Sequence, residues 1–156
     1  MRRLSSGATE PLDALWTDPG AILRASGRTP DPWQERFLKG GWSRALLCCS
    51  RQTGKSTSLG ALTVKTMLTE YPALCLLIGP AERQAKELMK AHVARMFAGL
   101  GWPVQAVKMG ELEIELANGS RCLVLPDNER TVRGYSEVSL VVIDEASRVS
   151  DDLYYS

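Results

Sequence analysis

The chain has 156 residues, of which 24% are charged and 44% hydrophobic, and its 19 basic and 18 acidic residues leave a net charge of +1. This length suffices for one domain with a buried core, and the balanced charge excludes a broadly basic surface, so any contact with nucleic acid must be local or transient. No apolar run reaches the roughly 20 residues of a membrane-spanning helix. The first residues, MRRLSSGATEPLD, lack the apolar stretch of a secretory signal. We therefore expect a cytoplasmic protein.

The N-terminal part is expected to contain little regular structure. Residues 1–30 are rich in Gly, Pro, Ser and charged residues, which predicts a loosely ordered lead with one helical turn around residues 11–16. A short helix then opens at Asp31, which is suited to the N-cap, and at Pro32, which is suited to the first helical position.

The next segments alternate between apolar runs and helical patterns. ALLCC at 45–49 and ALCLLIG at 73–79 predict short buried strands, while residues 55–70 predict a helix that stops before Pro72. The four cysteines lie in or beside such apolar runs and show no C-x-x-C spacing. We therefore expect buried free thiols in a reducing compartment, and neither disulfides nor a metal site.

The second half of the chain contains a helix, a hairpin and a strand. Residues 81–98 have the apolar spacing of an amphipathic helix, with His92, the single histidine, as a packed residue on its apolar face. Alternation in 111–116 and 121–125, joined by Asn-Gly, predicts a β-hairpin. The run SLVVID at 139–144 predicts a third buried strand that ends in an acidic residue.

This order of elements predicts an α/β domain over residues 31–156, with a mostly parallel sheet flanked by helices. The sequence ends twelve residues after Asp144. Because a complete sheet of this kind usually has another strand or two, we expect the domain to be incomplete at its C-terminal end.

The stretch CCSRQTGKS at 48–56 predicts a phosphate-binding loop. It ends in Gly54-Lys55-Ser56, although the pattern G-x-x-x-x-G-K-[ST] has glycine where this chain has Cys49, a small residue that can end the preceding strand. Gly54 lets the backbone approach phosphates, Lys55 brings a mobile charge to the β- and γ-phosphates, and Ser56 offers a hydroxyl to Mg²⁺. The alternative is a glycine turn into a serine-rich helix start.

The stretch LVVIDEAS supplies the acidic half of the same site. Asp144 at a strand end can hold Mg²⁺ beside the phosphates, and Glu145 can polarise the attacking water. A strand that runs into a charged turn is the alternative. Both signals nevertheless lie at the C-terminal ends of strands, where open α/β sheets bind ligands. Together they predict a site for ATP and Mg²⁺.

CCSRQTGKS resembles the Walker A loop of the large terminase subunits of tailed bacteriophages, the DNA-packaging motors. Pro32-Trp33-Gln34 is similar to the adenine-side glutamine motif of that family. IGPAERQAKEL at 78–88 and RGYSEVSLVVIDEAS at 133–147 resemble the segment after the loop and the segment that leads into Walker B. The resemblance extends over about residues 31–150, and the combination is more specific than any single piece.

The resemblance implies a P-loop NTPase fold (RecA/ASCE-like) and an ATPase that drives double-stranded DNA into a capsid. Ser56 and Asp144 would ligate Mg²⁺, and Glu145 would orient the attacking water. Gln34 would read the adenine edge, and the alternative is a capping box with Asp31. The implied nucleotide-binding set is Trp33, Gln34, Cys49, Ser50, Arg51, Gln52, Thr53, Gly54, Lys55, Ser56 and Thr57, with Lys55 and Arg51 also catalytic.

Two arginines are candidates for stabilising transition-state charge. Arg51, inside the loop, would sense the γ-phosphate, and the alternative is a hydrogen bond that braces the loop. Arg133 is a candidate arginine finger that would reach the ATP of a neighbouring subunit. The alternative is that Arg133 holds a local turn with Gly134.

The partners implied by the family are double-stranded DNA, a portal protein and a small terminase subunit, within a ring homo-oligomer in the host cytoplasm and away from membranes. The sequence ends before the family's Ser/Thr-rich coupling motif and its nuclease domain, so we expect no nuclease activity. Two other functions stay open. One is a helicase-like ATPase of superfamily 2, whose acidic box usually differs from Glu145-Ala146-Ser147. The other is a truncated remnant that binds nucleotide or a partner without turnover.

Overall fold

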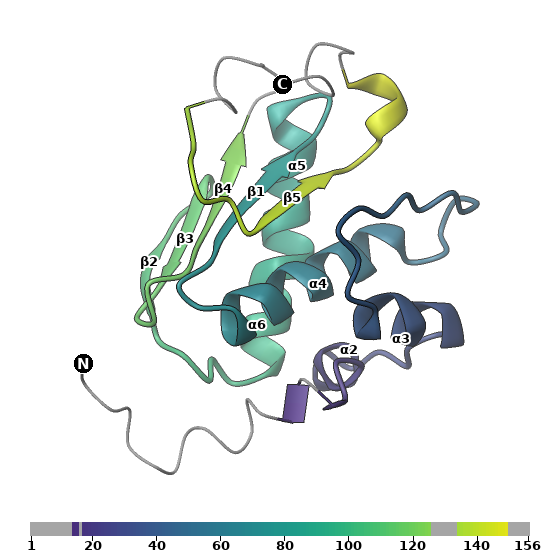
Figure 1. Ribbon diagram of the computed structural model, residues 1–156, viewed down its shortest axis with the longest axis horizontal. Helices are drawn as coiled ribbons and strands as arrows, with labels where there is room; N and C mark the ends of the chain where they lie inside the picture. Colours follow the sequence, from purple (N-terminus) through teal and green to yellow (C-terminus); the bar gives the residue numbers. More distant parts are fainter. Residues whose placement is uncertain (1–13, 16, 126–133, 150–156) are drawn as a thin grey trace.

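The computed structural model describes residues 14–15, 17–125 and 134–149, and within these ranges five strands form one sheet (Figure 1). The order across the sheet is β2-β3-β4-β1-β5. The centre is parallel, because β1 pairs in parallel with both β4 and β5, whereas β2–β3 and β3–β4 are antiparallel. The sheet therefore has the expected parallel centre and the expected antiparallel hairpin, and β2 adds a second antiparallel pair. The strands are β1 (Leu74–Ile78), β2 (Ala106–Met109), β3 (Glu113–Leu116), β4 (Arg121–Leu125) and β5 (Leu140–Ile143).

Most predicted elements are present. The predicted hairpin is β3 and β4, and the predicted strands at 73–79 and 139–144 are β1 and β5. The helical segment expected over 81–98 is also present, but its middle turns are π-helical. The helical elements are α2 (Ala21–Ala25), α3 (Pro32–Lys39), α4 (Lys55–Thr69), α5 (Glu82–Leu88), η1 (Met89–Ala94, π), α6 (Arg95–Gly99) and η2 (Ala146–Arg148, 3-10).

The main core lies between one face of the sheet and the helices. Alternate residues of β1 point to opposite faces, as the period of two in a strand requires. Cys75 and Leu77 therefore join the main cluster with residues of α2, α3, α4, α5 and α6. Leu76 and Ile78 belong to a second, smaller cluster on the other face. In the described ranges, the helices that flank the sheet thus pack on one of its faces.

The expectation of a loosely ordered lead up to residue 30 is wrong for α2. Ile22 and Leu23 are almost completely buried, and α2 packs on α4 and α6. These two apolar residues lie in a segment rich in Gly, Pro, Ser and charged residues, and that composition obscured them. The helical turn expected around 11–16 falls largely outside the described residues, although Leu15 is buried.

The expectation of a buried strand at 45–49 is also wrong. This segment joins no strand ladder, and Leu46 is 79% exposed. A strand needs a neighbour for its backbone N–H and C=O groups. In the described ranges, β5 is the last strand of the sheet on this side, and its Val141 is 45% exposed. The apolar run at 45–49 therefore lacks a paired strand on which to form.

The four cysteines divide into two pairs. Cys75 and Cys122 are buried partners on neighbouring strands, as expected, and burial raises the pKa of Cys75 to about 12 and also raises that of Cys122. Cys48 is exposed and Cys49 is half-buried, which corrects the expectation that all four are buried. All four thiols are free.

This division predicts the order of thiol alkylation. In the folded chain, iodoacetamide should modify Cys48 first, because the rate of alkylation depends on the fraction of thiolate and on the exposure of the sulfur to the reagent. Cys75 and Cys122 should react only after denaturation, since both are buried and protonated. Peptide mass spectrometry after timed labelling checks this order. Rapid native labelling of either buried cysteine would contradict the packing of β1 against β4.

In the part of the chain that the structure describes, no helix is both long and apolar enough to cross a membrane.

Candidate functional site

The loop before α4 has a backbone suited to wrapping around an anion. Gln52 and Gly54 both adopt left-handed conformations, with φ of 60° and 82°. Gly54 is the N-cap residue of α4, and a Cβ added there would lie only 2.7 Å from Nε2 of Gln34. The helix therefore starts at Lys55, and its first backbone N–H groups, which lack partners within the helix, face the loop. This arrangement favours a bound phosphate.

The Lys55 side chain closes the loop on itself. Its Nζ donates to the carbonyl oxygens of Cys49 at 2.9 Å and Ser50 at 2.7 Å. The hydroxyl of Thr53 donates to the same Ser50 oxygen at 3.0 Å. The loop thus uses the backbone of residue 49, not its side chain, which explains how cysteine can stand where the pattern has glycine. Phosphate oxygens at this place would substitute for the two carbonyl oxygens around the ammonium group.

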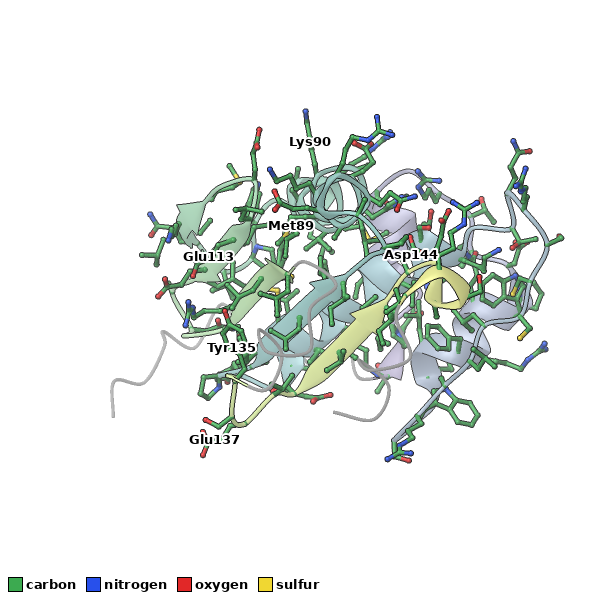
Figure 2. The ribbon with its side chains drawn as sticks, turned by 90° about the horizontal axis from the view of Figure 1, so that it is seen from above. Met89, Lys90, Glu113, Tyr135, Glu137 and Asp144 are labelled. Carbon is green, nitrogen blue, oxygen red and sulfur yellow. The ribbon has the colours of Figure 1, made fainter. Side chains whose placement is uncertain are left out.

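The structure brings the two halves of the predicted site together. The Ser56 hydroxyl donates to Oδ2 of Asp144 at 3.1 Å, across 88 positions of sequence. The Asp144 backbone N–H donates to the Ile78 carbonyl at 3.0 Å, which extends the pairing of β5 with β1 by one residue. Figure 2 shows Asp144 at the end of the β5 arrow. The carboxylate is therefore held beside the start of α4 by the sheet itself.

Ser56 and Asp144 fit a magnesium ion. Mg²⁺ takes oxygen ligands and keeps several waters, and in nucleotide sites it is held by one or two protein oxygens together with phosphates. Adjacent oxygen ligands of an octahedral Mg²⁺ are about 3 Å apart, so a hydroxyl and a carboxylate oxygen at 3.1 Å already have the separation that a shared ion requires. Both lie next to the helix start where phosphates would bind.

Glu145 follows the magnesium candidate in a strained conformation. Its φ of 51° and ψ of 44° are left-handed, which is uncommon for a residue with a side chain. Its Oε2 accepts hydrogen bonds from Gln84 Nε2 and from Arg148 Nη1, each at 3.3 Å. The side chain is exposed, but these two hydrogen bonds orient it. Glu145 and Asp144 both line one hollow in the surface.

This hollow contains residues that the motifs did not indicate. Gln84 and His92 come from the helix that follows β1, and they were not assigned to the site from the sequence. A usable signal existed, because residues after the C-terminal end of β1 lie beside those after β5 in a parallel pair. The lining residues are Ser56, Pro80, Gln84, Glu87, Leu88, His92, Asp144 and Glu145.

His92 is packed, as expected, but it also borders the site. Its Nδ1 lies 3.4 Å from the Thr57 hydroxyl. Burial lowers the pKa of His92, and the nearby cation Arg28 lowers it further. A Cβ at Gly60 would lie 2.6 Å from the His92 Cβ, so α4 and η1 approach closely at this point. At neutral pH the ring is therefore neutral and available for hydrogen bonding.

The remaining predicted residues are placed in different ways. Trp33 is half-buried and packs against the main core, whereas Arg51 is exposed on the loop. Gln34 and Thr57 line a second hollow on the α3 side of the loop, together with Gln52, Thr53 and Gly54. Arg133, the candidate finger, lies outside the described residues.

The end of β5, in the parallel part of the sheet, thus lies beside the Gly54-Lys55-Ser56 start of α4. The fold as a whole is similar to that of the solved ATPase domain of the large terminase of Thermus phage P74-26, with a TM-score of 0.73 and 16% sequence identity. The match covers 89% of this chain and 62% of that domain, so this chain spans less than two thirds of its length. No protein-family model and no curated protein matches the sequence.

Proposed function

We propose that this chain is the Mg²⁺-dependent, ATP-binding and ATP-hydrolysing core of a DNA-packaging motor of the large-terminase type. The observation that supports it most is the contact between Ser56 and Asp144, because it unites the two motifs at the start of α4. The fold likeness to a terminase ATPase domain supports the motor class.

Each residue then has a defined task. The first N–H groups of α4 and the Lys55 ammonium hold the β- and γ-phosphates, and Ser56 and Asp144 hold Mg²⁺ between them. Glu145 orients the water that attacks the γ-phosphorus and accepts its proton. Arg51, which is exposed on the loop, would stabilise the charge that develops on the γ-phosphate.

The motor partners follow from this proposal. Hydrolysis in a ring of such subunits would move double-stranded DNA into a capsid through a portal protein, with a small terminase subunit delivering the DNA. The net charge of +1 is compatible with a transient contact with DNA.

A second candidate function is nucleotide binding without turnover. The segment at 45–49 favours it, because it leads directly into the loop and joins no strand of the sheet. A loop without a strand on its N-terminal side would bind phosphates but would position them less firmly for in-line attack.

The experiment that separates the two is phosphate release from ATP with Mg²⁺ and with chelator, alongside ATP binding under the same conditions. Mg²⁺-dependent release that exceeds the spontaneous rate supports the ATPase. Binding with no release at any protein concentration supports the second candidate.

A further inference from the structure

Gln34 lies buried between the start of α3 and the start of α4, with only 5% of its surface exposed. Its Oε1 accepts a hydrogen bond from the Asp31 backbone N–H at 2.8 Å, which closes one half of a capping box. Its Nε2 donates to Oγ of Ser58 at 2.9 Å and to the carbonyl oxygen of Gly54 at 3.3 Å. One amide group thus joins the helix start of α3 to the last residue of the phosphate-binding loop.

The hydrogen-bond partners of the Gln34 amide determine which of its two terminal atoms is the oxygen and which is the nitrogen. A backbone N–H can meet only the amide oxygen, and a backbone carbonyl can meet only the amide nitrogen. Both N–H donors of Gln34 are therefore used inside the protein. Bidentate recognition of adenine needs a donor for a ring nitrogen and an acceptor for the amino group. In this arrangement, Gln34 has no donor left for a base.

The Gly54 carbonyl, by contrast, is held from three sides. It accepts from Gln34 Nε2, from Ser58 Oγ at 3.0 Å and from the Ser58 backbone N–H at 2.9 Å. In a planar trans peptide, the carbonyl of one residue and the N–H of the next point in opposite directions. Fixing the Gly54 carbonyl toward Gln34 therefore directs the Lys55 N–H away from it, toward the loop.

We infer that Gln34 is a positioning residue for the phosphate-binding loop, and that it contributes to affinity for the triphosphate and not for the base. This inference rests on the proposed function, since it assigns a role within the same nucleotide site. It replaces adenine recognition, which the resemblance implies for this residue.

The test compares three ligands that share a triphosphate: ATP, GTP and inorganic tripolyphosphate, each with Mg²⁺. Calorimetry on the wild-type chain and on Gln34→Met measures the three affinities. Methionine keeps the side-chain length without adding charge, but it leaves the Gly54 carbonyl without its Gln34 donor. We expect all three affinities to fall by about tenfold, as for loss of a buried hydrogen-bond partner, with the ATP-to-GTP ratio unchanged. Gln105→Met, the same change at an exposed position before β2, should leave all three unchanged.

Ser58→Ala is the second variant, because it removes the hydroxyl that links Gln34 Nε2 to the Gly54 carbonyl. It should lower the affinities for the three ligands by the same factor. If Gln34→Met fails to fold, this variant tests the inference in its place. A loss confined to ATP, with tripolyphosphate binding retained, would overturn the inference in favour of base reading. No loss for any ligand would also overturn it. A folded wild-type chain that binds none of the three would instead refute the proposed function, before any variant is compared.

Discussion

Lys55→Ala is expected to weaken binding of Mg²⁺-ATP by roughly a hundredfold, which is the effect of losing a charge-assisted contact to phosphate. The Nζ of Lys55 already lies among the oxygen atoms of the loop, 2.9 Å from the Cys49 carbonyl and 2.7 Å from that of Ser50. Alanine removes the ammonium group at the first residue of α4, while the α4 N–H groups and Arg51 remain as phosphate donors. Calorimetric titration of both chains with Mg²⁺-ATP measures the difference.

A matched control for this variant is Lys90→Ala. Lys90 is exposed on η1, and Figure 2 shows its side chain pointing away from the sheet and from Asp144. Its removal should leave the affinity for ATP within about twofold, the scale of a screened surface charge. If the two variants lose affinity equally, the effect of Lys55 is one of overall charge, and the loop has no special role.

Glu145→Gln is expected to reduce ATP turnover by at least about a hundredfold while leaving ATP affinity within a few-fold of the wild type. Glutamine keeps the size of the side chain and can still interact with Gln84 and Arg148, but it cannot accept the proton of the attacking water. Phosphate release under single-turnover conditions, beside a binding titration, separates the two quantities.

Glu137→Gln provides the comparison for Glu145. Both glutamates have positive φ, of 58° and 51°, but Glu137 precedes β5 whereas Glu145 follows it. Figure 2 places Glu137 and Asp144 at opposite ends of that strand. Turnover should be unchanged in Glu137→Gln. Full turnover by Glu145→Gln would remove Glu145 from the mechanism and direct attention to another group of the hollow, such as Glu87.

Local signals in the sequence were sufficient for the elements that determine their own conformation. The Asn-Gly turn predicted the β3–β4 hairpin, and Asn118 and Ser120 also anchor it by donating to the Met67 carbonyl at the end of α4. The Asp31-Pro32 start of α3 and the run of α4, in which Gly60 is the one helix breaker, could likewise be predicted, because caps and helix propensity act within a few residues.

Features that depend on residues distant in the sequence could not be predicted from it. The run at 45–49 has the composition of a strand, yet a strand requires a partner, and the edge of β5 is not filled in the described ranges. Strand β2, which is short and mostly exposed and pairs antiparallel with β3, was also not predicted. An exposed edge strand has little apolar alternation to reveal it.

The sequence predicted the two motifs of the site, but it did not predict the residues that line its third side. Asp144 follows a predicted strand, and Ser56 lies at the start of a predicted helix. Such ends meet at one edge of an α/β sheet, so the sequence alone allowed the two residues to be paired. Gln84 and His92 lie on a helix whose apolar spacing indicated packing alone, and their position beside Glu145 and Thr57 depends on how η1 packs on α4.

The proposed function requires that the start of α4 and the end of β5 form one site for a magnesium-bound triphosphate. The most direct measurement is calorimetric titration of the folded wild-type chain with ATP, in excess Mg²⁺ and again in chelator. We expect one-to-one binding on the order of micromolar affinity with Mg²⁺, and binding at least about tenfold weaker in its absence. A folded chain that shows no binding heat and no thermal shift with Mg²⁺-ATP, or that binds ATP equally well without the metal, would rule out such a site.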